Sequence, residues 1–317
     1  MSGGERQAGD GHWARAATPG ITPRVSVLMT IYNAGPYLRR SIESLLRQSF
    51  GDWELIAVEN GSNDNSASIL ASYEDRRIGA FFLRANIGRT PALRYAFQQA
   101  RGEYIAVLDA DDVTQPERLC RQVEHLDAHP EVVLLGTWAD YIDADNEIIG
   151  AWTPPTDAAA LLTSMASENP IVHSSAMYRA AIARDVGGYP EDWPYSQDYG
   201  LWLKLLARGA PGMLPERLTQ FRILSSSVTR SRKHELDVAH DLLRAMIDAG
   251  HELNLCDEGR RRNREEVAIA RLRYAAALAK SRRLTEGVRT AWRALVTDPI
   301  AVVNNRITRG LFWRLRE

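Results

Sequence analysis

Short apolar runs alternate with helix-like segments along the first third of the chain. The runs at 25–33, 53–60, 78–84 and 104–108 are rich in Val, Ile, Leu and Phe and have the length of β-strands. In the segments between them, apolar residues recur every three or four positions, as in helices that cover a sheet. This succession predicts a mixed, mostly parallel sheet with helices on both faces. The helices are expected to begin at Pro36 and to span about 66–73 and 90–100.

The later part of the chain shows less regular alternation. A helix is expected from Pro116 to about 128, followed by a strand and a hairpin that turns at 143–146 (DADN). Another amphipathic helix opens with Asp198, and everything beyond Lys233 has helical periodicity. We therefore predict three regions, which are a disordered N-terminal segment (1–23), an α/β domain (24–231) and a C-terminal all-helical extension (232–317).

Composition places the chain among ordinary globular proteins, with 45% hydrophobic and 25% charged residues in a length of 317. Its two cysteines, Cys120 and Cys256, are far apart and have no metal or redox spacing, which suits a reducing compartment. No apolar run has the length of a signal peptide or a membrane span. A cytoplasmic protein is expected, and a nucleic-acid partner is not.

The net charge of −1 conceals an asymmetry between the two ends of the chain. Residues 257–317 carry a net charge of +8, which leaves −9 for the remainder. A basic helical region can lie at the anionic inner face of the cell membrane, dock on the α/β domain, or form a dimer. These alternatives stay open at the level of sequence.

Polar residues gather where the predicted strands end. Thr30 closes the first run, Asn60 follows the second, and Asp109, Asp111 and Asp112 follow the fourth. In open α/β sheets, these carboxyl ends form the ligand crevice. Closely packed carboxylates repel one another and lose hydration, so they require a compensating cation or solvent. The pattern predicts a phosphate or nucleotide ligand held together with a cation.

Seven motifs in sequence resemble the family 2 glycosyltransferases, which have the GT-A (Rossmann-like) fold. They are VSVLMTIYN, ENGSNDNS, NIGRTPALRYAFQQARGEYIAVLDADD, HSSAMYR, GGY, QDYGLWLKL and FRILSSSVTR, and they cover about 24–230. The resemblance implies an inverting, divalent-metal-dependent transfer of a sugar from a nucleotide-sugar donor to a hydroxyl of a glycan or lipid-linked acceptor. It further implies a role in cell-surface polysaccharide biosynthesis.

The same resemblance assigns the donor side of the site. Asp109 and Asp111 match the family's DXD motif and would hold Mn²⁺ or Mg²⁺ on the donor diphosphate. A divalent ion neutralises the charge that grows on a departing nucleoside diphosphate, which is the chemistry these acids suit. Thr30 and Tyr32 match residues that contact the nucleotide. Among the arginines near the motif NIGRTP, Arg94 is the first candidate for a diphosphate contact, with Arg84 and Arg89 as further ones.

The motif ENGSNDNS departs from the family's usual DDGSTDGT. Glu59 and Asn60 occupy the positions of its paired acids, where an aspartate accepts a proton from a uracil ring. An asparagine amide can both accept and donate hydrogen bonds, so a pyrimidine base remains compatible while UDP itself is placed in doubt.

The acceptor side is assigned to three residues. Asp198 matches the general base of inverting members, which deprotonates the acceptor hydroxyl as it attacks the anomeric carbon. Gln197 stands where the family usually has Glu, and His173 stands where it often has His. The motif FRILSSSVTR has Leu224 where some members carry a metal- or diphosphate-binding His, so Ser225, Ser226 and Ser227 are alternative contacts. The loop at Gly187, Gly188 and Tyr189 is expected to be exposed.

Two other classes of function remain compatible with the sequence. Glu59, Asn60, Gln197 and Leu224 all depart from the family pattern, which is consistent with a catalytically weak relative that binds nucleotide sugars or glycans. A sugar-phosphate nucleotidyltransferase on a similar sheet would release pyrophosphate instead of a nucleoside diphosphate. The intact Asp109, Asp111 and Asp198 favour the glycosyltransferase.

Overall fold

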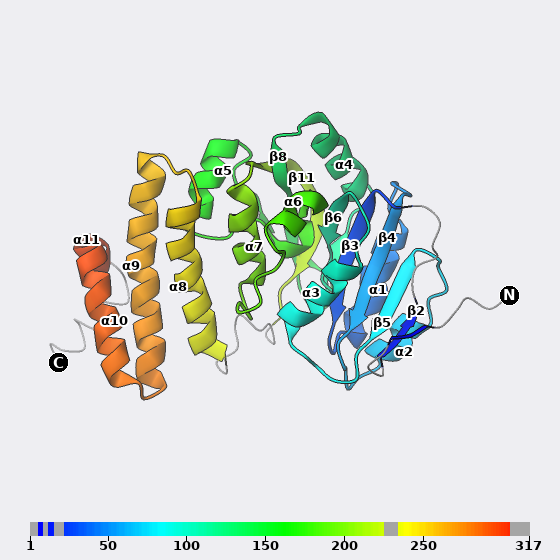
Figure 1. Ribbon diagram of the computed structural model, residues 1–317, viewed down its shortest axis with the longest axis horizontal. Helices are drawn as coiled ribbons and strands as arrows, with labels where there is room; N and C mark the ends of the chain where they lie inside the picture. Colours follow the sequence, from blue (N-terminus) through cyan, green and yellow to red (C-terminus); the bar gives the residue numbers. More distant parts are fainter. Residues whose placement is uncertain (1–5, 9–11, 16–21, 225–233, 305–317) are drawn as a thin grey trace.

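The structure is a computed structural model that describes residues 6–8, 12–15, 22–224 and 234–304 (Figure 1). Parallel strands β5, β4, β3 and β6 lie side by side at its centre. They correspond to the apolar runs of the sequence, because strands covered on both faces need apolar side chains on both. Their bounds are Val25–Ile31 (β3), Trp53–Glu59 (β4), Ile78–Phe82 (β5) and Tyr104–Val107 (β6).

The sheet continues beyond β6 with mixed strand directions. Strand β10 is antiparallel to both β6 and β8, whereas β11 runs parallel to β8 and antiparallel to β7. Strands β8 and β9 form the predicted hairpin, and its turn places Asn146 at a φ of 71°. The bounds are Val113–Thr114 (β7), Val132–Ile142 (β8), Ile148–Trp152 (β9), Met177–Arg179 (β10) and Ala210–Arg222 (β11).

Two short strands lie within the N-terminal segment. β1 (Arg6–Ala8) pairs with β2 (His12–Arg15), which extends the sheet by pairing antiparallel with β5. The prediction of disorder over 1–23 is therefore wrong for these residues. Backbone pairing at a sheet edge places little demand on side-chain pattern, which explains why composition did not reveal it.

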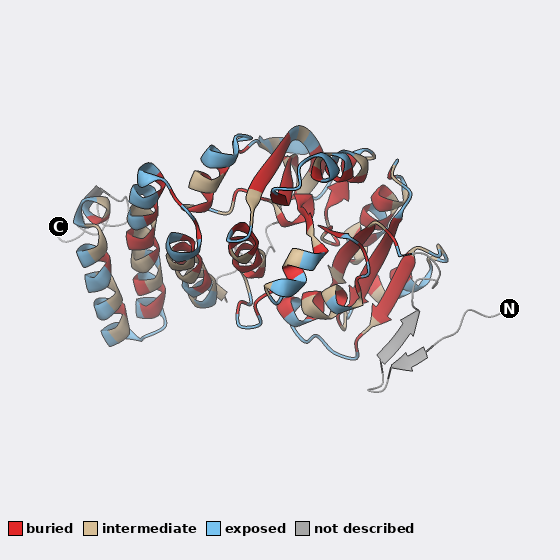
Figure 2. Cartoon of the chain, turned by 45° about the horizontal axis from the view of Figure 1, so that its top comes forward, coloured by how far each residue is buried: buried red, intermediate tan, exposed pale blue. Residues whose placement is uncertain are grey.

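Helices cover both faces of the sheet, and the central strands appear as buried elements in Figure 2. Alternate strand residues such as Val27 and Leu28 belong to different cores, because successive side chains of a strand point to opposite faces. Helices α1 (Gly35–Leu46), α2 (Ser66–Ala71) and α4 (Arg118–Ala128) pack on one face. The other carries α3 (Arg89–Gln99), α5 (Ala158–Met165), α6 (Ala180–Asp185) and α7 (Gln197–Leu206), with the 3₁₀ turn η1 (His173–Ser175) between β9 and β10.

The C-terminal region is helical, as predicted. Leu243 and Met246 of α8 belong to the same buried core as α7, so α8 is joined to the α/β region by apolar packing. The following helices lie in a row, with α9 between α8 and α10 (Figure 1). None of the helices in the described part of the chain combines the length and the apolar character needed to cross a bilayer. The bounds are Glu235–Glu252 (α8), Asp257–Lys280 (α9), Leu284–Thr297 (α10) and Pro299–Asn304 (α11).

Candidate active site

The acidic turn, residues 109–112, directly follows the buried end of β6. The Asp109 backbone N–H donates to Ser174 Oγ (3.0 Å), while Ser41 Oγ donates to the Asp109 carbonyl (3.1 Å). The Asp112 N–H closes the turn by donating to the same carbonyl (3.1 Å). Ser41 lies on α1 and Ser174 on η1, so elements from both faces of the sheet hold the turn in place.

Asp112 is the buried member of the turn. Its carboxylate accepts hydrogen bonds from the Ser174 hydroxyl and from the Arg222 backbone N–H (2.7 Å). Burial raises the pKa of Asp112 well above its ordinary value, and the charges of Asp111 and Asp109 act in the same direction. With both oxygens engaged internally, Asp112 serves the structure of the turn.

Arg222 connects this turn to the β8–β9 hairpin. Its Nε donates to the Asp111 carbonyl (2.8 Å), and its guanidinium also donates to the Asp143 carbonyl and to Asn146 Oδ1 (2.7 Å). The same guanidinium lies 4.5 Å from the ring centroid of Tyr37, within cation–π range. The second DADN segment is thus a turn, as predicted, and it anchors the arginine that supports the first.

Asp109 is already compensated by a cation within the chain. Arg89 Nη2 lies 2.6 Å from Asp109 Oδ2, and His173 Nδ1 lies 3.1 Å from Asp109 Oδ1. Although burial opposes ionisation, Arg89 and His173 hold the pKa of Asp109 well below its usual range. Arg89 was a secondary candidate in the sequence, and the structure places it against the first acid of the acidic turn.

Asp111 is in the opposite situation. Its side chain is half-buried, and among the described residues no other residue donates a hydrogen bond to its carboxylate. Burial raises its pKa, and the neighbouring Asp109 raises it further. Of the three acids, Asp111 therefore has the strongest need for an added cation.

The acidic turn fits a divalent ion that takes only part of its ligands from the protein. Within the described ranges, no group of three or more His, Cys, Asp or Glu residues is arranged to hold a metal. Carboxylate oxygens are hard ligands, and Mg²⁺ commonly uses one or two of them together with water and substrate phosphates. Asp111, assisted by Asp109 if Arg89 moves aside, matches that type of site.

The Gly187–Gly188–Tyr189 loop is exposed only in part, because Gly187 is exposed as expected whereas Gly188 and Tyr189 are buried. Gly187 and Gly188 have φ values of 82° and 67°, which allow the chain to turn Tyr189 inward. The Tyr189 hydroxyl lies 3.1 Å from His173 Nε2, so His173 bridges Asp109 and this loop. Aromatic bulk and two internal hydrogen-bond partners of the hydroxyl, His173 and Tyr178 (3.3 Å), explain the burial.

Arg94 binds the same loop from outside. Its guanidinium donates to the Tyr189 and Gly187 carbonyls, the latter at 3.5 Å, and forms an ion pair with Glu191 (3.5 Å). The structure therefore brings Arg89, and not Arg94, to the acidic turn. A contact between Arg94 and the donor stays a prediction.

Glu59 and Asn60 use their side chains to shape loops. The Glu59 carboxylate accepts from the backbone N–H groups of Gly61 (3.2 Å) and Ser62 (2.7 Å). Asn60 accepts from the Ile87 N–H (3.0 Å) and donates to the Gly88 carbonyl (3.1 Å). Since this second loop leads directly into Arg89, Asn60 helps to position the arginine that pairs with Asp109. Base recognition by these two residues stays a prediction.

Asp198 lies in the first turn of α7. Its negative charge acts on Arg89, the same guanidinium that pairs with Asp109. Burial opposes the charge of Arg89, but Asp109, Asp198 and Asp111 together hold its pKa above the ordinary value. Asn169 Nδ2 donates to Asp198 Oδ2 (2.9 Å), which fixes the carboxylate. The neighbouring Gln197 is buried, and its Oε1 has no hydrogen-bond partner within the described part of the chain.

The remaining candidates lie along the same rim. Thr30 is half-buried near the end of β3, whereas the Tyr32 side chain is 46% exposed just beyond it. Arg84 is exposed, and Leu224 is half-buried at the end of the described segment. The alternative contacts Ser225, Ser226 and Ser227 lie outside the described residues.

Sequence reasoning missed three residues that organise this site. Two of them, Ser174 and Arg222, support the acidic turn, and Asn169 supports Asp198. For none of the three did the type of side chain at its position indicate a role in the site. Ser174 follows His173 in the motif HSSAMYR, so that motif was the available signal. No comparable pattern singles out Asn169.

Comparisons with known proteins are consistent with this geometry. The family profile described as Glycosyl transferase family 2 matches residues 26–187. An uncharacterized glycosyltransferase of Methanocaldococcus jannaschii is 32% identical, with 68% of this chain and 76% of that protein covered. TuaG of Bacillus subtilis, named as a teichuronic acid biosynthesis glycosyltransferase, is 30% identical, with coverages of 66% and 83%.

Solved structures of other proteins share the fold of this chain. TarS of S. aureus, solved in complex with UDP-GlcNAc, has a TM-score of 0.63 at 18% identity and covers 86% of this chain and 79% of its own. A mannosyltransferase of Pyrobaculum calidifontis, in complex with GDP-Man and Mn²⁺, has a TM-score of 0.59 at 19% identity, with coverages of 93% and 85%. These likenesses confirm the predicted GT-A fold, with its mixed sheet flanked by helices.

Proposed function

The chain belongs to glycosyl transferase family 2 and is a glycosyltransferase, and we propose that it is an inverting, divalent-metal-dependent one. Its substrates would be a nucleotide-sugar donor and a hydroxyl of a glycan or lipid-linked acceptor. One observation carries this proposal. The acidic turn offers Asp111, whose carboxylate accepts no hydrogen bond from another described residue, beside the compensated Asp109. The charges of Asp109, Asp111 and Asp198 all act on Arg89.

Asp111 and Asp109 would hold the metal. When bound, Mn²⁺ or Mg²⁺ supplies Lewis-acid neutralisation of the leaving diphosphate. Arg89 can then turn from Asp109 toward a phosphate oxygen, for which its planar guanidinium is well suited. His173 would keep Asp109 oriented through Nδ1, while the Tyr189 hydroxyl holds the ring at its other nitrogen, Nε2. Tyr32, exposed at the end of β3, would pack against the base, with Thr30 beside it.

Asp198 would act as the general base. As the acceptor hydroxyl attacks the anomeric carbon, its proton passes to a carboxylate oxygen of Asp198, while the nucleoside diphosphate departs on the opposite side. Asn169 holds one oxygen of this carboxylate, leaving the other to accept the proton. A single displacement of this kind inverts the anomeric configuration. Gln197 lies next to this base and would contribute to the acceptor side.

A role in cell-surface polysaccharide synthesis is supported by the likeness to TuaG. We further propose peripheral contact at the inner face of the cell membrane through α10 and α11. Exposed apolar residues recur there every four positions, with Val288, Trp292 and Val296 at 71%, 67% and 70% exposure. Arg289 and Arg293 flank them, and the sequence from 257 onward has a net charge of +8. Apolar and cationic residues on one short helix suit an anionic lipid interface.

The configuration of the product tests the mechanism. Purified enzyme, an α-linked nucleotide-sugar donor and Mn²⁺ are followed by ¹H NMR of the anomeric proton in the transferred sugar. A β-linked product supports single displacement with Asp198 as base. An α-linked product contradicts inversion, and donor-bound protein that releases no nucleoside diphosphate with any acceptor supports the non-catalytic alternative.

A further inference from the structure

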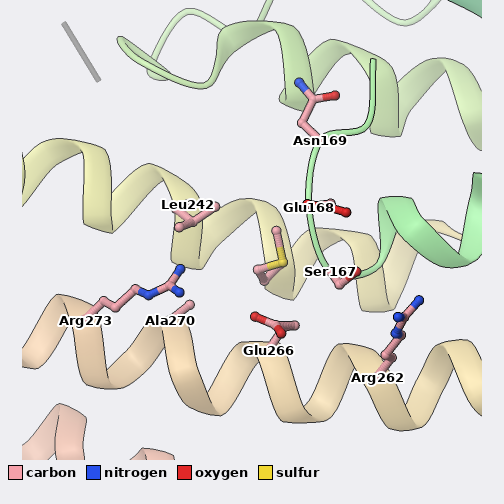
Figure 3. Close-up of a pocket in the computed structure, with 9 residues that line it drawn as sticks. Ser167, Glu168, Asn169, Leu242, Arg262, Glu266, Ala270 and Arg273 are labelled. Carbon is pink, nitrogen blue, oxygen red and sulfur yellow. The ribbon is translucent and has the colours of Figure 1, made fainter. Parts of the chain in front are cut away.

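A pocket of about 420 Å³ opens next to Asn169, the residue that holds Asp198 (Figure 3). Its walls come from the loop after α5 and from helices α8 and α9. Since Asn169 both lines the pocket and donates to Asp198, the pocket lies next to the candidate base and extends from there along α8 and α9. Its volume falls in the range of roughly 300 to 1,000 Å³ that is typical of ligand sites.

Four charged side chains line this pocket. They are Glu168 from the loop, Arg262 and Glu266 one turn apart on α9, and Arg273 two turns further along the same helix (Figure 3). Within the described part of the chain, none of these side chains forms a hydrogen bond or an ion pair. Glu168, Arg262 and Arg273 are exposed, and the two arginines act on the half-buried Glu266 only through their charges, so the donors and acceptors of all four side chains are open to solvent and to a ligand.

A second pocket shows that this situation is not general. About 310 Å³ in volume, it is also lined by charged residues, including Arg94, Glu191, Asp192 and Arg244. There some of the charges pair internally, because Arg94 lies 3.5 Å from Glu191 and Arg244 pairs with Asp192, whereas Lys204 and Glu252 form no ion pair within the described residues. The pocket beside Asn169 differs in that all four of its charged side chains lack an ion pair within the described part of the chain.

The chemistry of these groups selects a class of ligand. A guanidinium only donates hydrogen bonds and an ionised carboxylate only accepts them, whereas a hydroxyl does both. The two arginines would attract a polyanion, but Glu168 and Glu266 would repel it. A cation would be attracted by the two glutamates and repelled by the two arginines. A neutral chain rich in hydroxyls satisfies all four. Leu242, Met246 and Ala270 supply apolar surface for the carbon faces of sugar rings.

The walls of the pocket are fixed relative to one another. Asn263 Nδ2 donates to the carbonyls of Ala166 (2.9 Å) and Met246 (2.7 Å), which ties α9 to the end of α5 and to α8. Gly250 permits this contact, since a Cβ there would lie 2.4 Å from Asn263 Oδ1. The site is thus formed before any ligand arrives, which reduces the entropy lost on binding.

We propose that this pocket is a distal acceptor subsite that binds neutral saccharide or polyol units while the reacting hydroxyl of the same acceptor lies at Asp198. The inference rests on the proposed function, because it takes Asp198 as the base. It adds the acceptor class, which is a neutral polyhydroxylated chain longer than one sugar unit. It also gives α8 and α9 a role in substrate binding.

The test uses the full-length protein without nucleotide, so it does not depend on donor chemistry. The protein is applied to an array of neutral oligosaccharides, polyols and acidic glycans, and hits are titrated by calorimetry. The test variants are Arg262→Ala with Arg273→Ala, and Glu266→Gln. Arg264→Ala is the matched control, because it changes an exposed arginine of the same helix outside the pocket. Circular dichroism checks that each variant is folded.

We expect a neutral ligand that loses roughly tenfold to hundredfold in affinity in the double arginine variant and binds normally to Arg264→Ala. In transfer assays, KM for a long acceptor rises accordingly, while kcat and KM for a monosaccharide acceptor stay unchanged. The inference is overturned if only acidic glycans bind, or if a neutral glycan binds with the same affinity to the wild-type protein, the double arginine variant and Glu266→Gln. Asp198→Asn separates the two claims, since it should keep glycan binding and lose turnover.

Discussion

Arg89 Nη2 lies 2.6 Å from Asp109 Oδ2, so a guanidinium already pairs with the first acid of the acidic turn. The packed carboxylates are thus compensated unequally. Asp109 forms an ion pair with Arg89, whereas Asp111 forms none within the described residues, and its pKa stays raised although the charges of Arg89 and Arg222 oppose this. On the proposed function, Arg89 and a divalent ion would compete for Asp109 until a diphosphate is present to receive the arginine.

Replacing Arg89 should therefore strengthen metal binding in the absence of donor. In Arg89→Gln, Asp109 becomes available and a positive charge is removed, so Mn²⁺ affinity should rise roughly threefold to tenfold. Donor affinity should fall because a phosphate ligand is lost. Manganese titration by electron paramagnetic resonance measures the first effect, with exposed Arg84→Gln as the control. Weaker manganese binding in Arg89→Gln would contradict this competition.

Asp198→Asn should spare donor binding and reduce kcat by about 10²- to 10⁴-fold, because an amide cannot take the acceptor proton. Asn169→Ala should reduce kcat by a smaller factor, roughly tenfold, since it only releases the hydrogen bond that orients Asp198. Steady-state kinetics with saturating donor distinguish the two. Full turnover in Asp198→Asn would show that the base lies elsewhere.

Asp64 should contribute stability that depends on pH. It accepts hydrogen bonds from the Gly35 and Ser66 N–H groups (2.9 Å each), joining the starts of α1 and α2. Burial opposes ionisation, but these bonds lower its pKa in the folded state. The stabilisation is therefore present above the unfolded pKa near 4 and is lost as pH falls through the folded value.

The expected size of this effect is modest because Asp64 is exposed and screened by solvent. Asp64→Asn should lower the free energy of unfolding by about 1 kcal/mol at pH 7 and by much less near pH 3. Urea unfolding at both pH values measures this, with Asn63→Ala as the neighbouring control. If the difference in free energy of unfolding between the unmodified protein and Asp64→Asn were larger at pH 3 than at pH 7, the proposed role of Asp64 would be contradicted.

The exposed stripe on α10 should bind anionic vesicles. Trp292→Glu places a charge at the centre of the stripe, so binding to phosphatidylglycerol vesicles should fall roughly tenfold, while binding to pure phosphatidylcholine stays weak for both proteins. Co-sedimentation measures both. If Trp292→Glu instead converts a dimer to a monomer in analytical ultracentrifugation and leaves vesicle binding unchanged, the stripe is an interface between two copies.

Much of the architecture followed from local pattern. The strands Val25–Ile31 and Trp53–Glu59 coincide closely with apolar runs, because strands covered on both faces carry mostly apolar side chains. The buried Ser26 and Glu54 are exceptions, and they hydrogen-bond to each other (2.7 Å). The resemblance to family 2 glycosyltransferases is confirmed by the matching profile. The helical C-terminal region also followed from periodicity, whereas its sharing of a core with α7 did not.

The site was only partly predictable. The strand-end rule placed Asp109 and Asp111 together, but it could not identify the cation that compensates Asp109, since Arg84, Arg89 and Arg94 are chemically equivalent in sequence. Which acid each arginine contacts depends on the conformation of the loop around it. The buried Asn60 sets this conformation through hydrogen bonds to residues 86–88. Arg222 bonds Asp112 across 110 positions of the chain, a separation at which local patterns carry no information.

The most direct test of metal-assisted donor binding is a thermal-shift screen with UDP-, GDP-, dTDP- and CDP-sugars, each with Mn²⁺ and with EDTA. At a hundredfold excess over Kd, one donor class should raise Tm by roughly 4 °C or more with Mn²⁺ only. Asp111→Asn should abolish this shift, whereas Asp145→Asn, in the exposed β8–β9 turn, should preserve it. Equal stabilisation in EDTA, or a full shift in Asp111→Asn, would contradict a metal held by the acidic turn.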